Sequence, residues 1–149
     1  MLAGGGPEEE ALRGRLGPHA TFLGWCETAE LARIYASADA FLFPSVTDTF
    51  GQVVLEAQAS GLPVVAVAEG GPLSLIEHGE TGLLASAEPG ALGDALLSIV
   101  REPLVAQRLR EAALAAVSSR TWEASFERLA AGYRGALRRA GRGRARFVA

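Results

Sequence analysis

Two carboxylates, Asp48 and Glu56, lie eight residues apart in a segment whose other residues are mostly apolar. On a helix, which rises about 1.5 Å per residue, this spacing corresponds to about 12 Å. An ionised carboxylate accepts two strong hydrogen bonds, so it suits a pair of neighbouring hydroxyls. The spacing is close to the distance between the ribose and the sugar ring of a nucleotide-diphosphate sugar, and the pair therefore predicts a ligand of that shape.

The segment between the two acids, residues 49–51, opens a predicted helix. The first backbone N–H groups of a helix have no intrahelical partner, and the positive end of the helix dipole attracts anions. Gly51 lets a ligand approach the backbone closely. Spacings of four align Asp48, Gln52 and Glu56 along one helix face. We therefore expect this segment to hold three parts of one ligand. One carboxylate would bind the sugar hydroxyls, the backbone amides would bind a diphosphate, and the other carboxylate would bind the ribose hydroxyls.

Each of these features also has a purely structural interpretation. Asp48 is equally well explained as a helix cap, which stabilises by about 1 kcal/mol. Glu56 is less well explained as a solvated helix position, because its neighbours in residues 53–57 are apolar and a buried carboxylate is costly without a partner. Gly70 and Gly71, taken alone, indicate an ordinary turn.

Short apolar runs alternate along the chain with helical patterns. Strands are predicted at residues 1–3, 20–25, 40–45, 63–67 and 82–85, and helices at 7–17, 28–38, 50–60, 89–100, 103–118 and 121–139. This alternation predicts an α/β fold: a single Rossmann-like open parallel sheet with helices on both faces. Ligands of such sheets bind at the carboxyl ends of the strands. Residues 44–51 and 69–72 directly follow strands, so we expect both loops on one rim.

The composition indicates one globular domain with a hydrophobic core, because 49% of the 149 residues are hydrophobic. No apolar run approaches the ~20 residues that cross a bilayer, and the amino end lacks the basic and apolar regions of a signal peptide. A single cysteine, Cys26, fits a reducing compartment, and its spacing from the two histidines matches no metal site. We therefore expect a cytoplasmic protein without a metal.

The net charge of -3 combines two regions of opposite sign. Residues 1–100 contain 3 Arg and 13 Asp or Glu, whereas residues 101–149 contain 11 Arg and 4 Glu. The basic end, residues 138–149, is interpreted first as a solvated tail and second as a weak anchor to anionic lipid heads at the inner face of the membrane. Nucleic acid is the least supported partner, because no aromatic residues alternate with the arginines.

The stretch FPSVTDTFGQVVLEAQASGLPVVAVAEGGPLSLIEHGETGLL, residues 43–84, resembles the donor-binding half of retaining glycosyltransferases of family 4, which have the GT-B fold. The signature is an acid, seven residues and a glutamate, followed by a double glycine and TGLL. The resemblance extends over residues 1–137 and excludes the Arg-rich tail, residues 138–149. It implies a nucleotide-sugar-binding C-terminal domain that lacks its own first strand and helix and the N-terminal acceptor domain.

The resemblance also implies an activity: transfer of a hexose from a nucleotide-diphosphate sugar to an acceptor, with retention of configuration. It implies a front-face mechanism, no metal and no cofactor. The implied catalytic residues are Glu56, on the ribose hydroxyls, and Asp48, near the transferred sugar. The implied donor-binding residues are Pro44, Ser45, Thr49, Phe50, Gly51, Gln52, Gly70 and Gly71. The protein's share of catalysis is then positioning and stabilisation of the leaving diphosphate.

Two positions depart from the family pattern. Asp48 stands where the first acid is usually the longer Glu, and Ser74 stands where the family usually has Glu. A donor diphosphate carries about two negative charges, whereas a helix dipole offers about half a charge and residues 1–100 offer only three arginines. We therefore expect the isolated chain to bind a donor weakly and not to turn over.

Two other functions remain open at the level of sequence. One is a stand-alone α/β module that binds a nucleotide or a protein partner without chemistry. The other, less well supported, is a nucleotide-sugar epimerase of related fold, which needs further acids and histidines across a cleft. Among glycosyltransferases the motif, residues 47–57, resembles that of mannosyl- and glucosyl-transferring members. The sequence leaves the donor base and the acceptor, lipid-linked or carbohydrate, undetermined.

Overall fold

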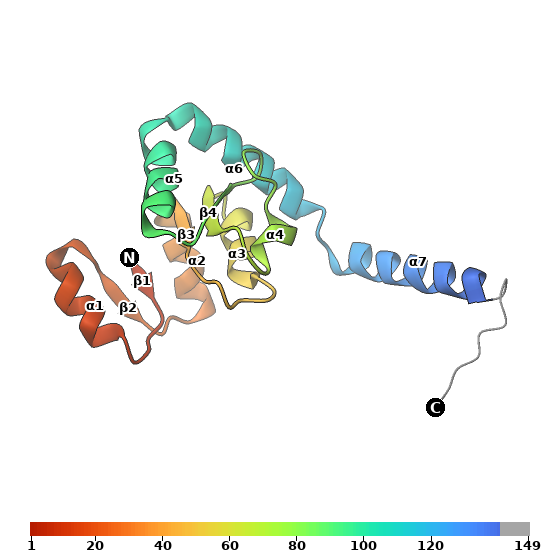
Figure 1. Ribbon diagram of the computed structural model, residues 1–149, viewed down its shortest axis with the longest axis horizontal. Helices are drawn as coiled ribbons and strands as arrows, with labels where there is room; N and C mark the ends of the chain where they lie inside the picture. The colour runs from red at the N-terminus through yellow and green to blue at the C-terminus, as the bar shows by residue number, and fades with distance from the viewer. Residues whose placement is uncertain (141–149) are drawn as a thin grey trace.

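The computed structural model describes residues 1–140 and has an α/β fold of short strands and longer helices (Figure 1). Its strands are β1 (Leu2–Ala3), β2 (Phe22–Gly24), β3 (Phe41–Phe43), β4 (Val64–Val67) and β5 (Leu83–Ala85). Its helices are α1 (Glu9–Leu16), the 3-10 turn η1 (Gly17–His19), α2 (Thr28–Ser37), α3 (Gln52–Ala59), α4 (Pro72–Leu75), α5 (Pro89–Arg101), α6 (Pro103–Ser118) and α7 (Trp122–Ala140). Every expected strand and helix is present, with boundaries shifted by a few residues.

The five strands pair in parallel but form two separate ladders, β1–β2 and β3–β4–β5. The α/β class with parallel strands is confirmed, whereas one continuous sheet is not formed within residues 1–140. A doubly wound sheet has the strand order 3-2-1-4-5-6. The ladders β2–β1 and β3–β4–β5 resemble the strand runs 3-2 and 4-5-6 of that order, which are not adjacent to each other.

Strand β4 is the centre of the core, and all four of its residues are fully buried. Successive residues of a strand point to opposite faces. Val64 and Ala66 pack with side chains of α2 and α3, whereas Val65 and Val67 pack with side chains of α5 and α6. Helices therefore cover both faces of this sheet, as its continuous apolar run predicts.

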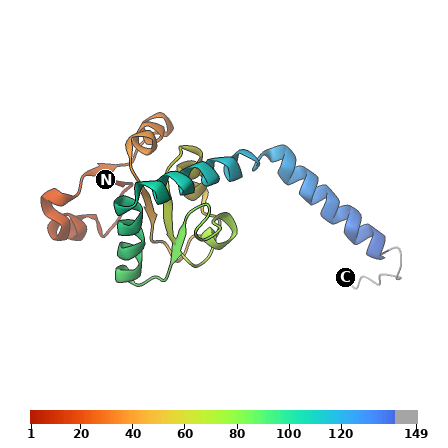
Figure 2. The ribbon, with the colours of Figure 1, turned by 90° about the horizontal axis from the view of Figure 1, so that it is seen from above.

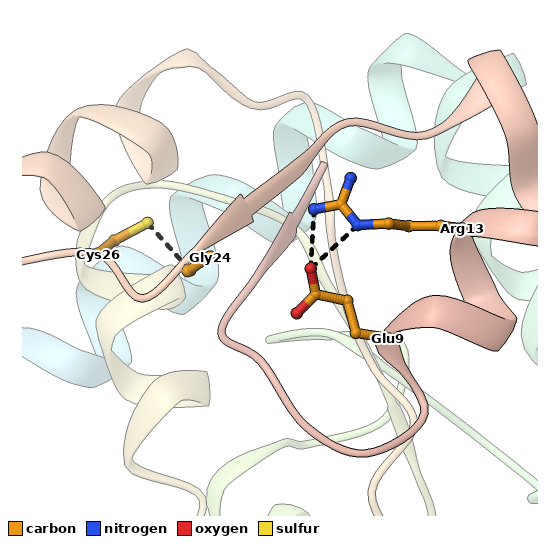
Figure 3. A network of polar contacts seen from close by, with 4 residues as sticks. All are labelled: Glu9, Arg13, Gly24 and Cys26. Carbon is orange, nitrogen blue, oxygen red and sulfur yellow. Dashed lines mark hydrogen bonds and ion pairs between the residues drawn. The ribbon is translucent and has the colours of Figure 1, made fainter.

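The amino-terminal β1–α1–β2 unit is held by local contacts and contributes no fully buried side chain. In α1, the Arg13 guanidinium pairs with the Glu9 carboxylate at 2.7 Å and lies over the Phe22 ring at 4.4 Å. Figure 3 shows this ion pair together with Cys26, whose Sγ donates to the Gly24 carbonyl at 3.6 Å. An exposed ion pair stabilises by less than about 1 kcal/mol, so this unit is less firmly packed than the sheet around β4.

Helix α7 projects away from the body of the molecule (Figures 1 and 2) and contains no buried residue. Its large apolar side chains are all more than half exposed: Trp122, Phe126, Leu129, Tyr133 and Leu137. Within the described part of the chain, no helix combines the length and the apolar character needed to span a membrane. Of the expected Arg-rich tail, residues 138–140 are the end of α7, and residues 141–149 lie outside the described residues.

Candidate functional site

The loops that follow β3 and β4 meet at the carboxyl ends of these strands. β3 and β4 are parallel neighbours, so their carboxyl ends lie at the same edge of the sheet. The Gly71 N–H donates to the Asp48 carbonyl oxygen at 3.1 Å, which joins residues 44–51 to residues 69–72. The strand–helix alternation predicts this arrangement of the two loops on one rim.

The double glycine is more than an ordinary turn, because both glycines lie against the backbone of the other loop. A Cβ atom at Gly70 would stand 2.5 Å from the Asp48 carbonyl oxygen, and one at Gly71 would stand 2.6 Å from the Phe50 carbonyl carbon. Gly70 also has a φ of +60°, in the left-handed region that favours glycine. Residues without side chains are therefore required here for the two loops to touch.

The Asp48 side chain folds back onto its own loop. Its Oδ1 accepts hydrogen bonds from the Phe50 N–H, at 2.9 Å, and from the Gly51 N–H. Short acidic side chains readily bond to the amides two or three residues ahead of them. Asp48 therefore caps backbone amides, as its purely structural interpretation predicts. Both bonds use Oδ1, so Oδ2 is the oxygen left for a ligand.

The start of α3 corrects one expectation about this segment. The helix begins at Gln52, and the preceding Gly51 is in the left-handed region with a φ of +74°. Asp48 therefore lies outside the helix, and the expected helical face shared by Asp48, Gln52 and Glu56 is wrong for Asp48. The Phe50 and Gly51 amides, which we expected to face a diphosphate, are bonded to Asp48 instead.

Glu56 is half-buried on α3 and has a partner that the sequence analysis missed. The Tyr35 hydroxyl of α2 donates to Glu56 Oε2 at 3.3 Å. Burial, together with the charge and the hydrogen bond of Glu56, raises the pKa of Tyr35 to about 12. The available signal was Tyr35 itself: a tyrosine on the apolar face of a helix usually finds a partner for its hydroxyl.

The remaining predicted site residues differ in exposure. Ser45 is half-buried, and its Oγ accepts a hydrogen bond from the Thr47 N–H at 3.4 Å. Gly51 and Gly71 are buried between the loops. The exposed members of the set are Pro44, Thr49, Phe50, Gln52 and Gly70. The structure thus brings the loop residues together on one rim, with Glu56 one turn further along α3.

Ser74 and Arg120 connect this rim to the carboxyl-terminal part of the chain. The Ser74 Oγ donates to the Gly71 carbonyl at 2.8 Å, so the serine stabilises the double-glycine turn. The Arg120 guanidinium donates to the Ser74 carbonyl at 3.2 Å. An arginine from the connection between α6 and α7 therefore reaches α4. It lies outside residues 1–100, so it was not among the three arginines considered above as partners of a diphosphate.

Gln58 is a buried polar residue of α3 that the sequence analysis did not single out. It is 1% exposed, and its Nε2 donates to the Thr81 carbonyl at 3.1 Å. The Thr81 Oγ1 in turn accepts from the Glu77 N–H at 2.9 Å. These bonds fasten α3 to the segment that leads into β5, and they have a structural role.

A cavity of about 670 Å³ lies near the other end of β3, lined by residues that include Asp39, Ile99, Val100, Gln107 and Arg110. Asp39 precedes β3, so this cavity is near the amino end of the strand. None of the predicted site residues lines it. Because ligands of open α/β sheets bind at the carboxyl ends of the strands, the rim is the better candidate. Within residues 1–140, no group of three or more His, Cys, Asp or Glu side chains is arranged to hold a metal ion.

Comparison with known proteins decides the family. The model of the family described as glycosyl transferases group 1 matches residues 1–102. The chain belongs to this family. The resemblance found in the sequence is thereby confirmed.

Two curated relatives illustrate the similarity. The GDP-mannose-dependent alpha-mannosyltransferase of Mycolicibacterium smegmatis is 38% identical over 141 residues, which are 93% of this chain and 36% of that protein. The D-inositol 3-phosphate glycosyltransferase 1 of Catenulispora acidiphila is 37% identical over 120 residues, which are 80% of this chain and 28% of that protein. The chain therefore spans about a third or less of the length of these curated relatives.

Solved structures that superpose on this chain agree with the fold. Sucrose-phosphate synthase from Thermosynechococcus elongatus superposes with a TM-score of 0.78 at 31% identity, over 91% of this chain and 38% of that chain. HepE from Anabaena, solved in complex with UDP, superposes with a TM-score of 0.72 at 27% identity, over 87% of this chain and 36% of that chain. The two ladders and their helices thus correspond to one part of a larger glycosyltransferase fold.

Proposed function

We propose that this chain is the nucleotide-sugar-binding domain of a retaining hexosyltransferase. The observation that carries the proposal is the contact between the loops after β3 and β4, where the Gly71 N–H bonds to the Asp48 carbonyl. This contact lies at the edge where open α/β sheets bind ligands. HepE, a structural relative, has been solved with UDP-glucose, and the name of the M. smegmatis relative specifies GDP-mannose.

In the proposed complex, the donor lies along the rim from α3 toward the double glycine. The Glu56 carboxylate accepts hydrogen bonds from the ribose hydroxyls, and the diphosphate lies at the amino end of α3, where the helix dipole favours an anion. The hexose lies near Asp48 Oδ2. The other donor contacts are Pro44, Ser45, Thr49, Phe50, Gly51, Gln52, Gly70 and Gly71.

The proposed reaction needs no protein nucleophile, metal or cofactor. The bond between the hexose C1 and the diphosphate oxygen breaks, and the acceptor hydroxyl oxygen bonds to C1 on the same face. The acceptor proton passes to the leaving diphosphate, so atoms and charge balance. The residues of this chain contribute position and charge stabilisation.

We propose that the isolated chain binds a donor weakly and does not turn over. Glu56 and Asp48 bring negative charge toward the rim, whereas the Arg120 guanidinium is the one cationic group that the described residues bond to α4. A leaving diphosphate needs more positive charge than this arrangement supplies. The remaining part of a longer enzyme would then recognise the acceptor, lipid-linked or carbohydrate, in the cytoplasm or at the inner face of the membrane.

Isothermal titration calorimetry with UDP, GDP, UDP-glucose and GDP-mannose tests the proposal. We expect binding that depends on the nucleotide part and weakens more than tenfold in Glu56→Ala. Glu127→Ala is the matched control, because Glu127 lies on the exposed α7 far along the chain from the rim, and its affinity should equal that of the unmodified chain.

Three results would contradict parts of this proposal. Absence of binding to every nucleotide would favour a module that serves another purpose. Binding that survives unchanged in Glu56→Ala would remove Glu56 from the site. Sugar transfer by the purified 149-residue chain would show that its own residues complete the catalytic electrostatics.

A further inference from the structure

Tyr35 and Glu56 make a contact that joins two helices on one face of the sheet. They lie 21 residues apart in the sequence, on α2 and α3, and the Tyr35 hydroxyl donates to Glu56 Oε2 at 3.3 Å. A carboxylate can only accept hydrogen bonds, so the tyrosine is the donor. The other carboxylate oxygen, Oε1, takes no part in this bond.

The Tyr35 ring is packed in the core. The residue is 7% exposed and belongs to the same buried cluster as Val54 and Ala57 of α3. Its ring meets that of Phe41 edge to face, with centroids 5.7 Å apart and an interplanar angle of 78°. Phe41 in turn pairs with Val64 in the β3–β4 ladder. The hydroxyl is therefore held at a defined place by the packing of the ring.

We infer that Tyr35 is a positioning residue for Glu56: its hydroxyl holds one carboxylate oxygen so that the other faces the ribose diol of a bound nucleotide. This inference rests on the proposed function, in which Glu56 binds the ribose. Without the tether, the Glu56 side chain has several rotatable bonds to order before it can accept two hydroxyls, and ordering a long side chain on binding lowers affinity.

The tether is present throughout the neutral pH range. Burial and the neighbouring Glu56 carboxylate raise the pKa of Tyr35 to about 12, so the hydroxyl keeps its proton and remains a donor. The distance of 3.3 Å is longer than a typical O–H···O hydrogen bond. Contacts in ligand-free sites often tighten in the complex, and the expected effect on affinity is accordingly moderate.

The test compares a nucleoside diphosphate with its 2′,3′-dideoxy analogue in Tyr35→Phe, which keeps the ring and removes the hydroxyl. The probes are GDP and dideoxy-GDP, or UDP and dideoxy-UDP if the chain prefers uracil. We expect Tyr35→Phe to weaken binding of the diol-bearing nucleotide by about 3- to 10-fold and to leave binding of the dideoxy nucleotide unchanged. In the Glu56→Ala background, Tyr35→Phe should have no further effect.

A merely structural role for Tyr35 predicts a different result, since a disturbed core would weaken binding of both nucleotides equally. Tyr133→Phe is the matched control, because Tyr133 is 65% exposed on α7. If Glu56→Ala and the missing diol each weaken binding but Tyr35→Phe does not, the inference is overturned and the proposed function stands. If the unmodified chain binds neither nucleotide, both are overturned.

Discussion

Gly71 lies directly against the backbone of Phe50: a Cβ atom added to the glycine would stand 2.6 Å from the Phe50 carbonyl carbon. The Gly71 N–H also donates to the Asp48 carbonyl at 3.1 Å. The loop after β4 therefore supports the loop after β3, and the two form one packed unit. Any side chain at residue 71 has to separate them.

Gly71→Ala is expected to lower the free energy of unfolding by about 1–3 kcal/mol, because overpacking forces one of the loops to move. The Gly71 backbone has a φ of -54°, which alanine adopts freely, so the effect comes from contact alone. Urea denaturation followed by circular dichroism measures it. In the control Gly93→Ala, the added Cβ meets nothing within 4 Å, and alanine inside α5 should be neutral or stabilise by up to about 1 kcal/mol. Equal losses at the two positions would contradict the tight contact.

Gln58→Leu is expected to lower the free energy of unfolding by about 1–3 kcal/mol. The substitution removes the donor of the buried hydrogen bond to the Thr81 carbonyl, and an unpaired buried acceptor is costly. Gln52→Leu, at the exposed start of the same helix, should change it by less than about 0.5 kcal/mol. The same urea titration compares them. Similar values for both would mean that the Thr81 carbonyl finds another donor.

Stability should fall as the pH rises from about 10 to about 12. The folded protein holds the Tyr35 proton with a pKa of about 12, against the ordinary value of 10.0 for a tyrosine. In this window the unfolded chain binds fewer protons than the folded one, so the free energy of unfolding decreases with pH, and below pH 10 the contribution is complete. One pKa unit corresponds to about 1.4 kcal/mol, and we expect a loss of about 2 kcal/mol after screening by water.

Urea titrations at pH 9, 10, 11 and 12 measure this loss. The chain contains no lysine, so few other groups change charge in the same window. Tyr35→Phe should flatten the decrease, and Tyr133→Phe should leave it in place. A decrease that is identical in all three proteins would assign the effect to other groups.

Large-to-small substitutions should lower the free energy of unfolding much more in the core than on α7. Leu109 of α6 is 0% exposed, and Leu109→Ala should cost about 2–5 kcal/mol of unfolding free energy. Phe126 of α7 is 62% exposed, and Phe126→Ala should cost less than about 0.5 kcal/mol despite the larger side chain removed. Thermal unfolding of the two variants provides the comparison. A large loss in Phe126→Ala would show that α7 is packed against something in solution.

The order of strands and helices could be predicted because it depends on local patterns. The four consecutive apolar residues of β4 are buried on both faces, which is the pattern of a covered parallel strand. The division into two ladders could not be predicted in this way. Which strand lies beside which is decided by contacts between distant segments, and the apolar patterns of β1 and β3 carry no information about their neighbours.

The rim could be predicted from the rule that ligands bind at strand ends, but its details could not. The position of Asp48 depends on whether its carboxylate accepts from the free amides just before α3 or leaves them to a ligand, and in this structure it accepts from them. The link from Tyr35 to Glu56 was missed because amphipathic patterns count a tyrosine as apolar and ignore its hydroxyl. The closeness of Gly71 to Phe50 depends on the approach of two loops, which no single segment reveals.

The break between β1 and β3 leaves each of these strands, within residues 1–140, with a ladder partner on one side only. Such edge strands present unpaired N–H and C=O groups that can pair with another extended polypeptide. Leu42 of β3 is 38% exposed, and β3 contains no charged residue that would oppose such pairing. In concentrated solutions, copies of this chain should therefore associate through their edge strands and increase light scattering. Leu42→Lys should reduce this association.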